Sequence, residues 1–266
     1  MTGGGVRAEE IDTSRPHPAR IYDYLLGGKD HYAVDQRAGD ALAAAAPEVR
    51  IGLRANRGFL RRAVRHVVGE GGVRQLLDIG TGLPTSPNVH EIAHEVAPDV
   101  RVAHVDNDPI VKTHGDALLS GDGTTSIVLG DLRDPRAVVD HPDIRRVIDF
   151  DEPVALLLVA IVHFLTDADK PEEIIATLRD ALPSGSYLVL SHATGDFADR
   201  TAAQAVYNTA SASLNLRSHA EVERYFDGFD LVEPGLAQAP FWRPEAPPPP
   251  GSELIGFYGG VARKRD

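Results

Sequence analysis

The chain has 266 residues, and its 39 acidic side chains outnumber the 27 basic ones to give a formal net charge of −12. It contains no cysteine, which excludes disulfides, thiolate nucleophiles, iron–sulfur clusters and cysteine-ligated zinc. The acidic balance argues against a protein that wraps a nucleic acid backbone, because such proteins need a basic face. The length fits one large α/β domain or two small ones.

No export or membrane segment is expected. Residues 1–10 are glycine-rich and polar and lack the apolar stretch of a signal peptide. The longest uninterrupted apolar run, residues 154–162, is far too short to span a bilayer as a helix. The protein is therefore predicted to be cytoplasmic, with no membrane contact.

The amino-terminal quarter is predicted to be a tail followed by helices. Residues 1–14 are small, charged and without periodicity, so we expect them to be disordered. Amphipathic or alanine-rich patterns then predict three helices, over residues 19–26, 32–46 and 49–68. The first ends at the pair Gly27-Gly28, a common stop signal for helices.

From Val73 onward, apolar strands alternate with helices. Strands are predicted over residues 75–79, 100–105, 126–129, 154–159 and 187–190. A capping residue followed by proline opens a helix at Ser86, at Asp108 and at Asp134, with expected ends near residues 96 and 119 for the first two. A fourth helix is predicted over residues 171–182. This alternation indicates βαβ units and a parallel sheet.

The alternation breaks after residue 190. A long helix is predicted over residues 199–214, and Ser218 and Glu221 form a capping box that opens another. The last two strands, 229–233 and 254–263, flank a proline-rich loop with no helix between them. They are predicted to form an antiparallel pair at one edge of the sheet.

The first chemical motif is a glycine turn after the first strand, in the run Asp78-Ile79-Gly80-Thr81-Gly82. Glycines let the backbone turn tightly and approach a ligand closely. A dinucleotide fingerprint needs a third glycine where Thr85 stands, which weakens a pyrophosphate interpretation. The acidic Asp78 before the first glycine better suits a ligand that carries an ammonium group.

Two further carboxylates follow the next two strands. Asp106, with Asn107 beside it, stands about two dozen residues after the glycines, where a carboxylate accepts the two hydroxyls of a ribose. Its neighbour Asp108 is predicted to cap a helix instead. Asp131 after the third strand is a candidate acceptor for an exocyclic adenine amine, with the apolar Leu132 beside the ring, or else only begins a turn.

These motifs resemble those of a known class. Asp78 to Gly82, Asp106 and Gly130-Asp131 are similar to the glycine, ribose and adenine motifs of class I S-adenosylmethionine-dependent methyltransferases. The runs RIYDYLLGGKDHY at residues 20–32 and RANRGFL at residues 54–60 resemble a bacterial family called S-adenosyl methyltransferase, formerly a domain of unknown function. The resemblance covers residues 15–263 and departs from the general class at Pro84, where many members have a glycine.

The resemblance implies a Rossmann-like, seven-stranded α/β sheet whose last strand is antiparallel. It implies a helical lid over residues 15–70 and a domain that binds S-adenosylmethionine over residues 71–266. The expected reaction is methyl transfer to a small-molecule acceptor, with no nucleic acid as partner. Residues expected to bind the cofactor are Asp78, Gly80, Thr81, Gly82, Asp106, Asn107, Asp131, Leu132 and Ala160.

Candidates for the acceptor side follow the fourth and fifth strands and the first helices. His163 is a candidate general base for a hydroxyl or amine, or else only packs against the cofactor, and His192 has a similar position. Tyr22, Tyr24 and His31 are lid candidates, unless they simply anchor their helix. The methionine carboxylate has two candidate partners on the third helix, Arg54 and Arg57.

Three other functions stay open at this stage. An aminopropyltransferase-like enzyme would need acidic residues such as those in the run 149–152 near its acceptor, and a cofactor-binding regulator would need no catalytic side chain. An NAD-dependent oxidoreductase is disfavoured by Thr85. No metal site is expected, and His90 and His94 are predicted to lie on an exposed helix surface.

Overall fold

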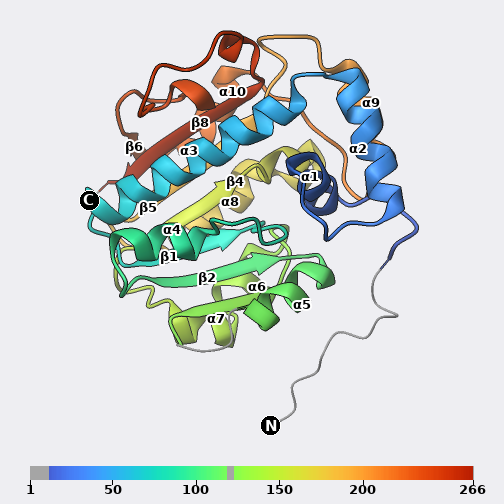
Figure 1. Cartoon of the computed structure of the whole chain (residues 1–266). Coiled ribbons are helices and arrows are strands. Elements are labelled where there is room, and N and C mark those ends of the chain that lie inside the picture. The colour runs from blue at the N-terminus through green and yellow to red at the C-terminus, as the bar shows by residue number, and fades with distance from the viewer. Residues whose placement is uncertain (1–11, 119–122, 266) are drawn as a thin grey trace.

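A mostly parallel β-sheet forms the centre of the computed structural model, which describes residues 12–118 and 123–265. The strand order is β3-β2-β1-β4-β5-β8-β6, and β7 pairs with β8 (Figure 1). The strands are β1 (Gln75–Ile79), β2 (Arg101–Asp106), β3 (Thr125–Leu129), β4 (Ala155–Val159), β5 (Tyr187–Ala193), β6 (Phe229–Leu231), β7 (Ala237–Gln238) and β8 (Phe257–Lys264). Only β8 runs against its neighbours β5 and β6. The sheet thus has the predicted architecture, with eight strands instead of seven.

Ten α-helices surround the sheet within the described residues. They are α1 (Pro18–Leu26), α2 (Ala33–Ala45), α3 (Val49–Gly69), α4 (Val89–Val96), α5 (Pro109–Leu118), α6 (Pro135–Val139), α7 (Pro142–Val147), α8 (Pro171–Asp180), α9 (Thr201–Tyr207) and α10 (His219–Glu223). None of these helices is both long enough and apolar enough to cross a bilayer. Residues 1–11 of the predicted tail lie outside the described part.

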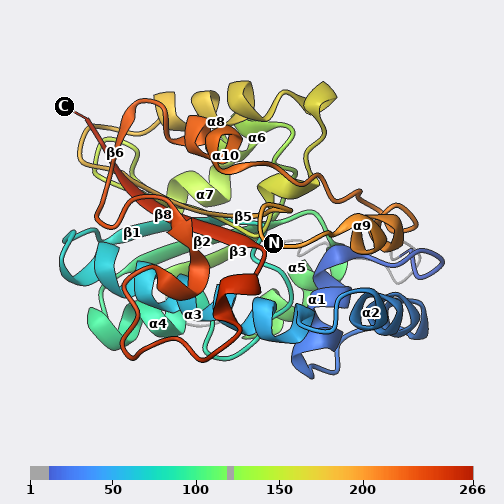
Figure 2. The ribbon, with the colours of Figure 1, turned by 90° about the horizontal axis from the view of Figure 1, so that it is seen from above.

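The helices and the sheet form three layers, which Figure 2 shows from above. One face of the sheet packs against α6, α7, α8 and α10, and the other against α3 and α4. Successive residues of a strand go to opposite faces, so that Leu76 belongs to the α3 side and Leu77 to the α8 side. The parallel strands are therefore apolar throughout, as expected for strands buried on both faces.

Helices α1 and α2 lie beyond the carboxyl ends of the parallel strands (Figure 1). Ile21, Leu25 and Leu42 pack there with Leu53 of α3 and Tyr207 of α9 in a separate apolar cluster. Apolar burial of this kind fixes the amino-terminal helices over the edge where a ligand of an α/β sheet binds.

Buried charges also fasten α1. Arg20 Nε lies 3.3 Å from Oδ2 of Asp108, and the Arg20 guanidinium lies 3.8 Å from Asp35 on α2. Asp35 in turn accepts a hydrogen bond of 2.9 Å from the backbone N–H of His17. Losing one partner would leave a buried charge uncompensated, so this cluster ties α1 and α2 to the loop after β2.

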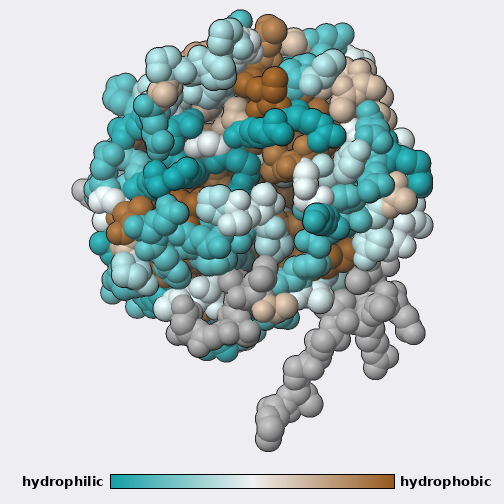
Figure 3. All heavy atoms as spheres, viewed as in Figure 1, coloured by the Kyte–Doolittle hydropathy of each residue, from teal (hydrophilic) through white to brown (hydrophobic). Residues whose placement is uncertain are grey.

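The single tryptophan, Trp242, packs against α3 in the apolar cluster that this helix forms with the sheet. It is completely buried, and its ring meets Phe59 edge-on at a centroid distance of 5.4 Å. Arg62 of α3 donates a hydrogen bond of 2.8 Å to its carbonyl. The surface over this core is mostly hydrophilic, with small hydrophobic patches on the face seen in Figure 3.

Two predicted helices need correction. The helix expected from Ser86 begins at Val89, because Asn88 and Glu91 form the capping box there. The helix expected over 199–214 is only α9, which ends at Tyr207. Beyond it the backbone turns away, and the N–H of Ser211 donates to the carbonyl of Pro16 instead of continuing the helix.

The carboxyl-terminal strands differ slightly from the prediction. The strand expected from residue 254 begins at Phe257, after a short 3₁₀ helix over Ser252–Leu254. The short strand β7 had no signal in the sequence. The antiparallel pairing of the last two predicted strands is confirmed, because β6 pairs with β8.

Candidate functional site

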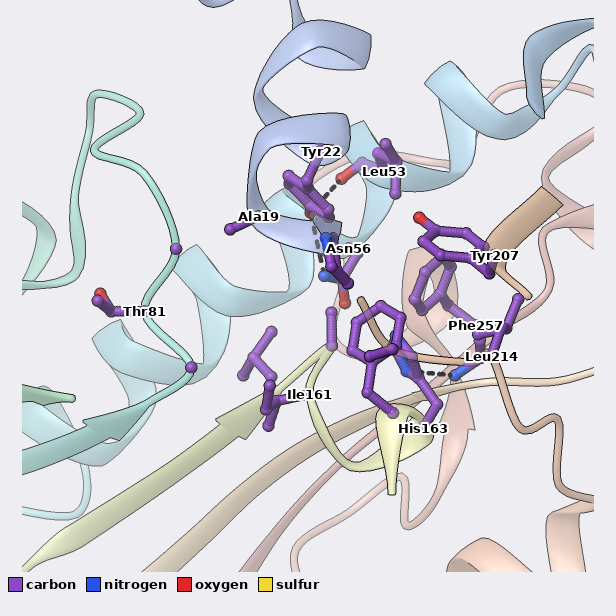
Figure 4. A pocket seen from close by; sticks show the side chains of 18 of the residues that line it. Ala19, Tyr22, Leu53, Asn56, Thr81, Ile161, His163, Tyr207, Leu214 and Phe257 are labelled. Carbon is purple, nitrogen blue, oxygen red and sulfur yellow. Dashed lines mark hydrogen bonds between the residues drawn. The ribbon is translucent and has the colours of Figure 1, made fainter. Parts of the chain in front are cut away.

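A cavity of ≈ 300 Å³ lies at the carboxyl ends of β1, β2, β3 and β4, under α1 and α3. This is where the strand order reverses, since β1 has β2 on one side and β4 on the other. Figure 4 shows side chains from the first helices, the glycine turn and the carboxyl-terminal part of the chain around it. We call its two parts the strand-end half, formed by Asp78, Gly80, Gly82, Asp106 and Asp131, and the helical half, formed by Tyr22, Asn56, His163, Phe164, Tyr207 and Phe257.

The predicted glycine turn lines the strand-end half. Gly80 and Gly82 have φ values of +77° and +69°, which a side chain disfavours. A Cβ on Gly80 would lie 2.6 Å from Cγ1 of Ile161, whereas a Cβ on Gly82 would meet no atom within 4 Å. Gly80 is thus needed for packing against the loop after β4, and Gly82 borders open space.

Asp78 is buried beneath this turn, and a row of polar contacts links it to His104 and then to His90. Its Oδ2 lies 3.0 Å from Nδ1 of His104, and the Thr81 hydroxyl lies 3.0 Å from the same nitrogen. Nε2 of His104 lies 3.3 Å from Nδ1 of His90. Burial, together with the nearby His104, lowers the pKa of His90 to about 4.

This arrangement corrects the prediction for His90 and His94. Both are half-buried rather than exposed, and their rings stack edge-on at 6.3 Å. Nε2 of His94 lies 2.9 Å from the carbonyl of Val100. His90 thus supports the turn through His104.

Asp106 lines the cavity at the end of β2. Its carboxylate accepts backbone N–H groups from Gly82 at 2.8 Å and from Asp108 at 2.9 Å. Burial nevertheless raises the pKa of Asp106 to about 6. Asn107 also lines the cavity, whereas Asp108 caps α5 as predicted, because its Oδ1 accepts the N–H of Ile110.

The remaining strand-end candidates also line the cavity. The half-buried carboxylate of Asp131 accepts a hydrogen bond of 2.7 Å from Arg133, and Leu132 is buried beside it. Ala160 has a φ of +56°, and its N–H donates to the hydroxyl of Ser191 at 3.0 Å. The loop after β4 is therefore held in a conformation that side chains rarely adopt.

The two histidine candidates differ in their access to the cavity, although their rings meet edge-on at a centroid distance of 5.5 Å. His163 lines the cavity, and the N–H of Ala193 donates to its Nδ1 at 3.2 Å. Burial lowers the pKa of His163 well below its usual value, so the ring is neutral with its proton on Nε2. His192 does not line the cavity, and its ring packs against those of both His163 and Tyr225.

Of the three lid candidates, only Tyr22 reaches the cavity. Tyr22 lines the cavity and donates to the carbonyl of Leu53 at 3.3 Å. Tyr24 and His31 do not line it: Tyr24 donates to Asp40, and His31 pairs with Asp23 at 2.9 Å. These two side chains fasten α1 to its neighbours.

The two arginine candidates on α3 differ in the same way. Arg57 reaches the cavity and donates to the carbonyls of Thr85 and Pro87 at 2.7 and 2.6 Å. Arg54 is exposed and does not line the cavity. Arg57 therefore connects α3 to the loop after the glycine turn.

Sequence reasoning missed most of the helical half. Asn56 is buried, donates to the Tyr22 hydroxyl at 3.2 Å and accepts from Ser191 at 2.6 Å (Figure 4). A signal for it exists, because Asn56 stands between Leu53 and Leu60 on the apolar face of α3, where a polar residue needs a partner. Phe164, Tyr207 and Phe257 carried no such signal.

No group of residues suited to a metal ion occurs in the described ranges 12–118 and 123–265. The acidic run 149–152 does not line the cavity, and Asp149 and Asp151 line a separate surface pocket with Arg101 and Arg145.

Residues 5–265 match the model of a family described as S-adenosyl methyltransferase. No curated protein sequence matches the chain. The chain is similar to the crystal structure of a DUF574 family protein from Streptomyces avermitilis MA-4680, with 47% identity and a TM-score of 0.91 over 96% of this chain and 100% of that one. It is similar to a proposed methyltransferase from Thermobifida fusca YX, with 39% identity and a TM-score of 0.90 over 96% and 97% of the two chains.

A more distant likeness supports the fold alone. The N-methyltransferase NodS from Bradyrhizobium japonicum WM9, solved with S-adenosyl-L-homocysteine, is 13% identical with a TM-score of 0.51 over 93% of this chain and 100% of that one. The predicted Rossmann-like methyltransferase fold is confirmed.

Proposed function

This chain belongs to the S-adenosyl methyltransferase family and has an S-adenosylmethionine-dependent methyltransferase fold, and we propose that it methylates a small molecule held in the helical half of the cavity. One observation carries the proposal. Three carboxylates that follow three successive strands, Asp78, Asp106 and Asp131, line the same cavity as the glycine turn. An adenosine with an ammonium-bearing tail needs acceptors spaced along such an edge.

The residues present fit S-adenosylmethionine. The space beside Gly82 is open where a Cβ would stand, so a ligand can approach the backbone there. When bound, the cofactor supplies an electrophilic methyl group on a positively charged sulfur. The acidic lining of the strand-end half tolerates that positive charge. Asp78 would hold the ammonium group of the cofactor, and His104 fixes the position of the Asp78 carboxylate.

The other contacts follow from the same geometry. Asp106 would accept the ribose hydroxyls, with Asn107 beside it. Asp131 would accept from the adenine amine, with Leu132 against the ring. Gly80, Thr81, Gly82 and Ala160 would supply backbone surface, and Arg57 would stand near the methionine carboxylate.

His163 has a chemical role different from the predicted general base. Its Nδ1 already accepts a backbone N–H, so the neutral ring offers a proton at Nε2 and no free lone pair. We therefore propose that His163 orients the acceptor by donating a hydrogen bond. Positioning in a dry pocket is then the main contribution of the protein.

The lid proposed for residues 15–70 is supported by α1 and α2, which cover the strand ends and place Tyr22 over the cavity. We propose residues 71–266 as the cofactor-binding domain, a cytoplasmic location and an acceptor other than nucleic acid. The acidic run 149–152 lies away from the cavity, so nothing favours the aminopropyltransferase alternative.

Calorimetry with S-adenosylhomocysteine and NAD tests the cofactor, and transfer of a labelled methyl group to a small-molecule extract tests the reaction. We expect binding of S-adenosylhomocysteine, no binding of NAD, and a labelled product. Tighter binding of NAD would overturn the proposal, and cofactor binding without transfer to any acceptor would favour a regulator.

A further inference from the structure

The charged groups of the helical half have partners within the protein. Glu48 and Arg200 both line the cavity, and they form an ion pair with each other. Arg200 also donates to the carbonyl of Leu254 at 2.8 Å. Neither side chain therefore offers a free charge to a ligand.

The same holds for two other ionisable groups near the acceptor space, while Arg57 donates to the carbonyls of Thr85 and Pro87 and is assigned above to the methionine carboxylate. Asp23 pairs with His31 at 2.9 Å and accepts the N–H of Asp30 at 3.0 Å. His163 is uncharged, as its hydrogen bond and burial require. A charged acceptor would lose its hydration there without gaining a counter-charge.

Aromatic rings form the wall of this part of the cavity. The ring of Phe164 lies 4.4 Å from that of His163 and 5.5 Å from that of Tyr207, measured between centroids. Phe257 meets His163 edge-on at 6.0 Å (Figure 4). Aromatic side chains in such arrangements favour contact with another ring.

Two donors remain in this wall. The Tyr22 hydroxyl is used, because it donates to Leu53 and accepts from Asn56. The Tyr207 hydroxyl and Nε2 of His163 form no hydrogen bond with any side chain or backbone group of the described residues. Both carry a proton, so they can donate to an oxygen or nitrogen atom of a ligand.

From these contacts we propose that the methyl acceptor is an uncharged aromatic small molecule anchored by one oxygen or nitrogen atom, which accepts hydrogen bonds from His163 and Tyr207. Another nucleophilic atom of the molecule takes the methyl group: its bond to the methyl carbon forms as the carbon–sulfur bond of the cofactor breaks, and the proton that it then loses leaves to water. The rings of Phe164 and Phe257 contact its apolar surface. This inference rests on the proposed function, since it assigns the helical half to the acceptor.

Three probes that share a naphthalene ring and differ in charge test the assignment: neutral 2-naphthol, anionic 2-naphthoate and cationic 2-naphthylmethylammonium. Each is titrated at pH 7 into the full chain saturated with S-adenosylhomocysteine, and binding is measured by calorimetry. We expect 2-naphthol to bind at least about tenfold more tightly than either charged probe, because an unpaired charge is costly in this wall.

Two substitutions in the wall test whether 2-naphthol binds in the helical half. Phe164→Leu keeps apolar volume and removes a ring, and Tyr207→Phe keeps a ring and removes a donor. Each should weaken 2-naphthol by about threefold to tenfold. Phe241→Leu is the matched control, because Phe241 is 40% exposed and does not line the cavity.

The outcomes separate this inference from the proposed function. Binding of S-adenosylhomocysteine by every variant verifies folding and the cofactor site. If the cofactor product binds but 2-naphthol does not, or if a charged probe binds as tightly, the acceptor class is wrong while the methyltransferase proposal stands. If S-adenosylhomocysteine itself does not bind, the proposed function fails.

Discussion

The two halves of the cavity are built in opposite ways. The strand-end half comes from one continuous stretch of chain, in which Asp78, Asp106 and Asp131 each follow a strand of the parallel sheet. The helical half combines Tyr22, Asn56, His163, Tyr207 and Phe257, which lie far apart in the sequence.

This difference explains why a ligand class can be inferred for one half more directly than for the other. A position just after a strand is a local property, and the sheet brings all such positions to one edge. Side chains from distant helices and loops meet only through packing, so no short motif records their arrangement. The following predictions test whether a change in one half of the cavity leaves the other half intact.

Gly80 of the strand-end half packs against Ile161 in the loop after β4, and its replacement should have the largest effect. Gly80→Ala adds a methyl group 2.6 Å from Ile161 at a positive φ. We expect the free energy of unfolding to fall by about 2–5 kcal/mol, from backbone strain and overpacking together. Urea denaturation followed by circular dichroism measures this change.

Gly82→Ala is the matched control, because φ is also positive there but the space is open. It should cost only about 1–2 kcal/mol of stability. Its methyl group should instead weaken S-adenosylhomocysteine. Equal losses of stability in the two variants would contradict the assigned contact with Ile161.

Asp106→Ala should damage the strand-end half alone. We expect S-adenosylhomocysteine to bind about 1–3 kcal/mol more weakly, because the ribose hydroxyls lose their acceptor. Calorimetry gives the affinity. The exposed Asp116, paired with Lys112, provides the control variant Asp116→Ala. Unchanged affinity in a folded Asp106→Ala protein would remove Asp106 from the ribose role.

The raised pKa of Asp106 predicts a pH dependence of the strand-end half. Burial holds this pKa near 6, so the carboxylate is ionised above that pH and protonated below it. Affinity for S-adenosylhomocysteine should fall by up to about tenfold per pH unit as the pH drops below 6. Titrations from pH 5 to 8 test this, and Asp106→Asn should flatten the profile.

Stability should respond to the same group with the opposite sign. The folded protein binds this proton more tightly than the unfolded chain, whose carboxyl titrates near 3.8. Ionisation of Asp106 therefore lowers stability as the pH rises from about 4 to 6, and ligand binding offsets that cost. A rise in ligand-free stability over this range in the wild type, absent from Asp106→Asn, would contradict the assigned pKa.

Arg57 and Arg54 should give the smallest effects and define the border of the site. Arg57→Ala removes two hydrogen bonds to the loop after the glycine turn, so we expect S-adenosylhomocysteine to bind about 0.5–1.5 kcal/mol more weakly. Arg54→Ala should change the affinity by less than about 0.5 kcal/mol. Equal effects in calorimetry would show that Arg57 acts only through general charge.

Several elements could be predicted because their signals are local. Asp134 accepts the N–H of Ala137 at 3.1 Å, so the cap-then-proline signal was right there. The same signal at Ser86 was wrong, because Asn88 forms a better capping box two residues later. The end of α9 at Tyr207 could not be predicted, since it depends on a hydrogen bond between Ser211 and the distant Pro16.

The candidate site follows the same rule. The residues of the strand-end half were found as a set, although the support of Asp78 by His104 and His90 was not. In the helical half, Tyr22 and His163 were found from their neighbours in the sequence. His192 was not separated from His163, because the two rings are in contact and only the packing of His192 against Tyr225 keeps it out of the cavity lining.

The position of Trp242 has a practical consequence for these experiments. As the only indole in the chain, it is the sole source of tryptophan fluorescence. It is completely buried against Phe59 and does not line the cavity. Its emission should therefore report loss of the core around α3 and stay nearly silent when a ligand enters. This built-in optical signal lets chemical denaturation be followed at the same time as ligand titration, without an added dye.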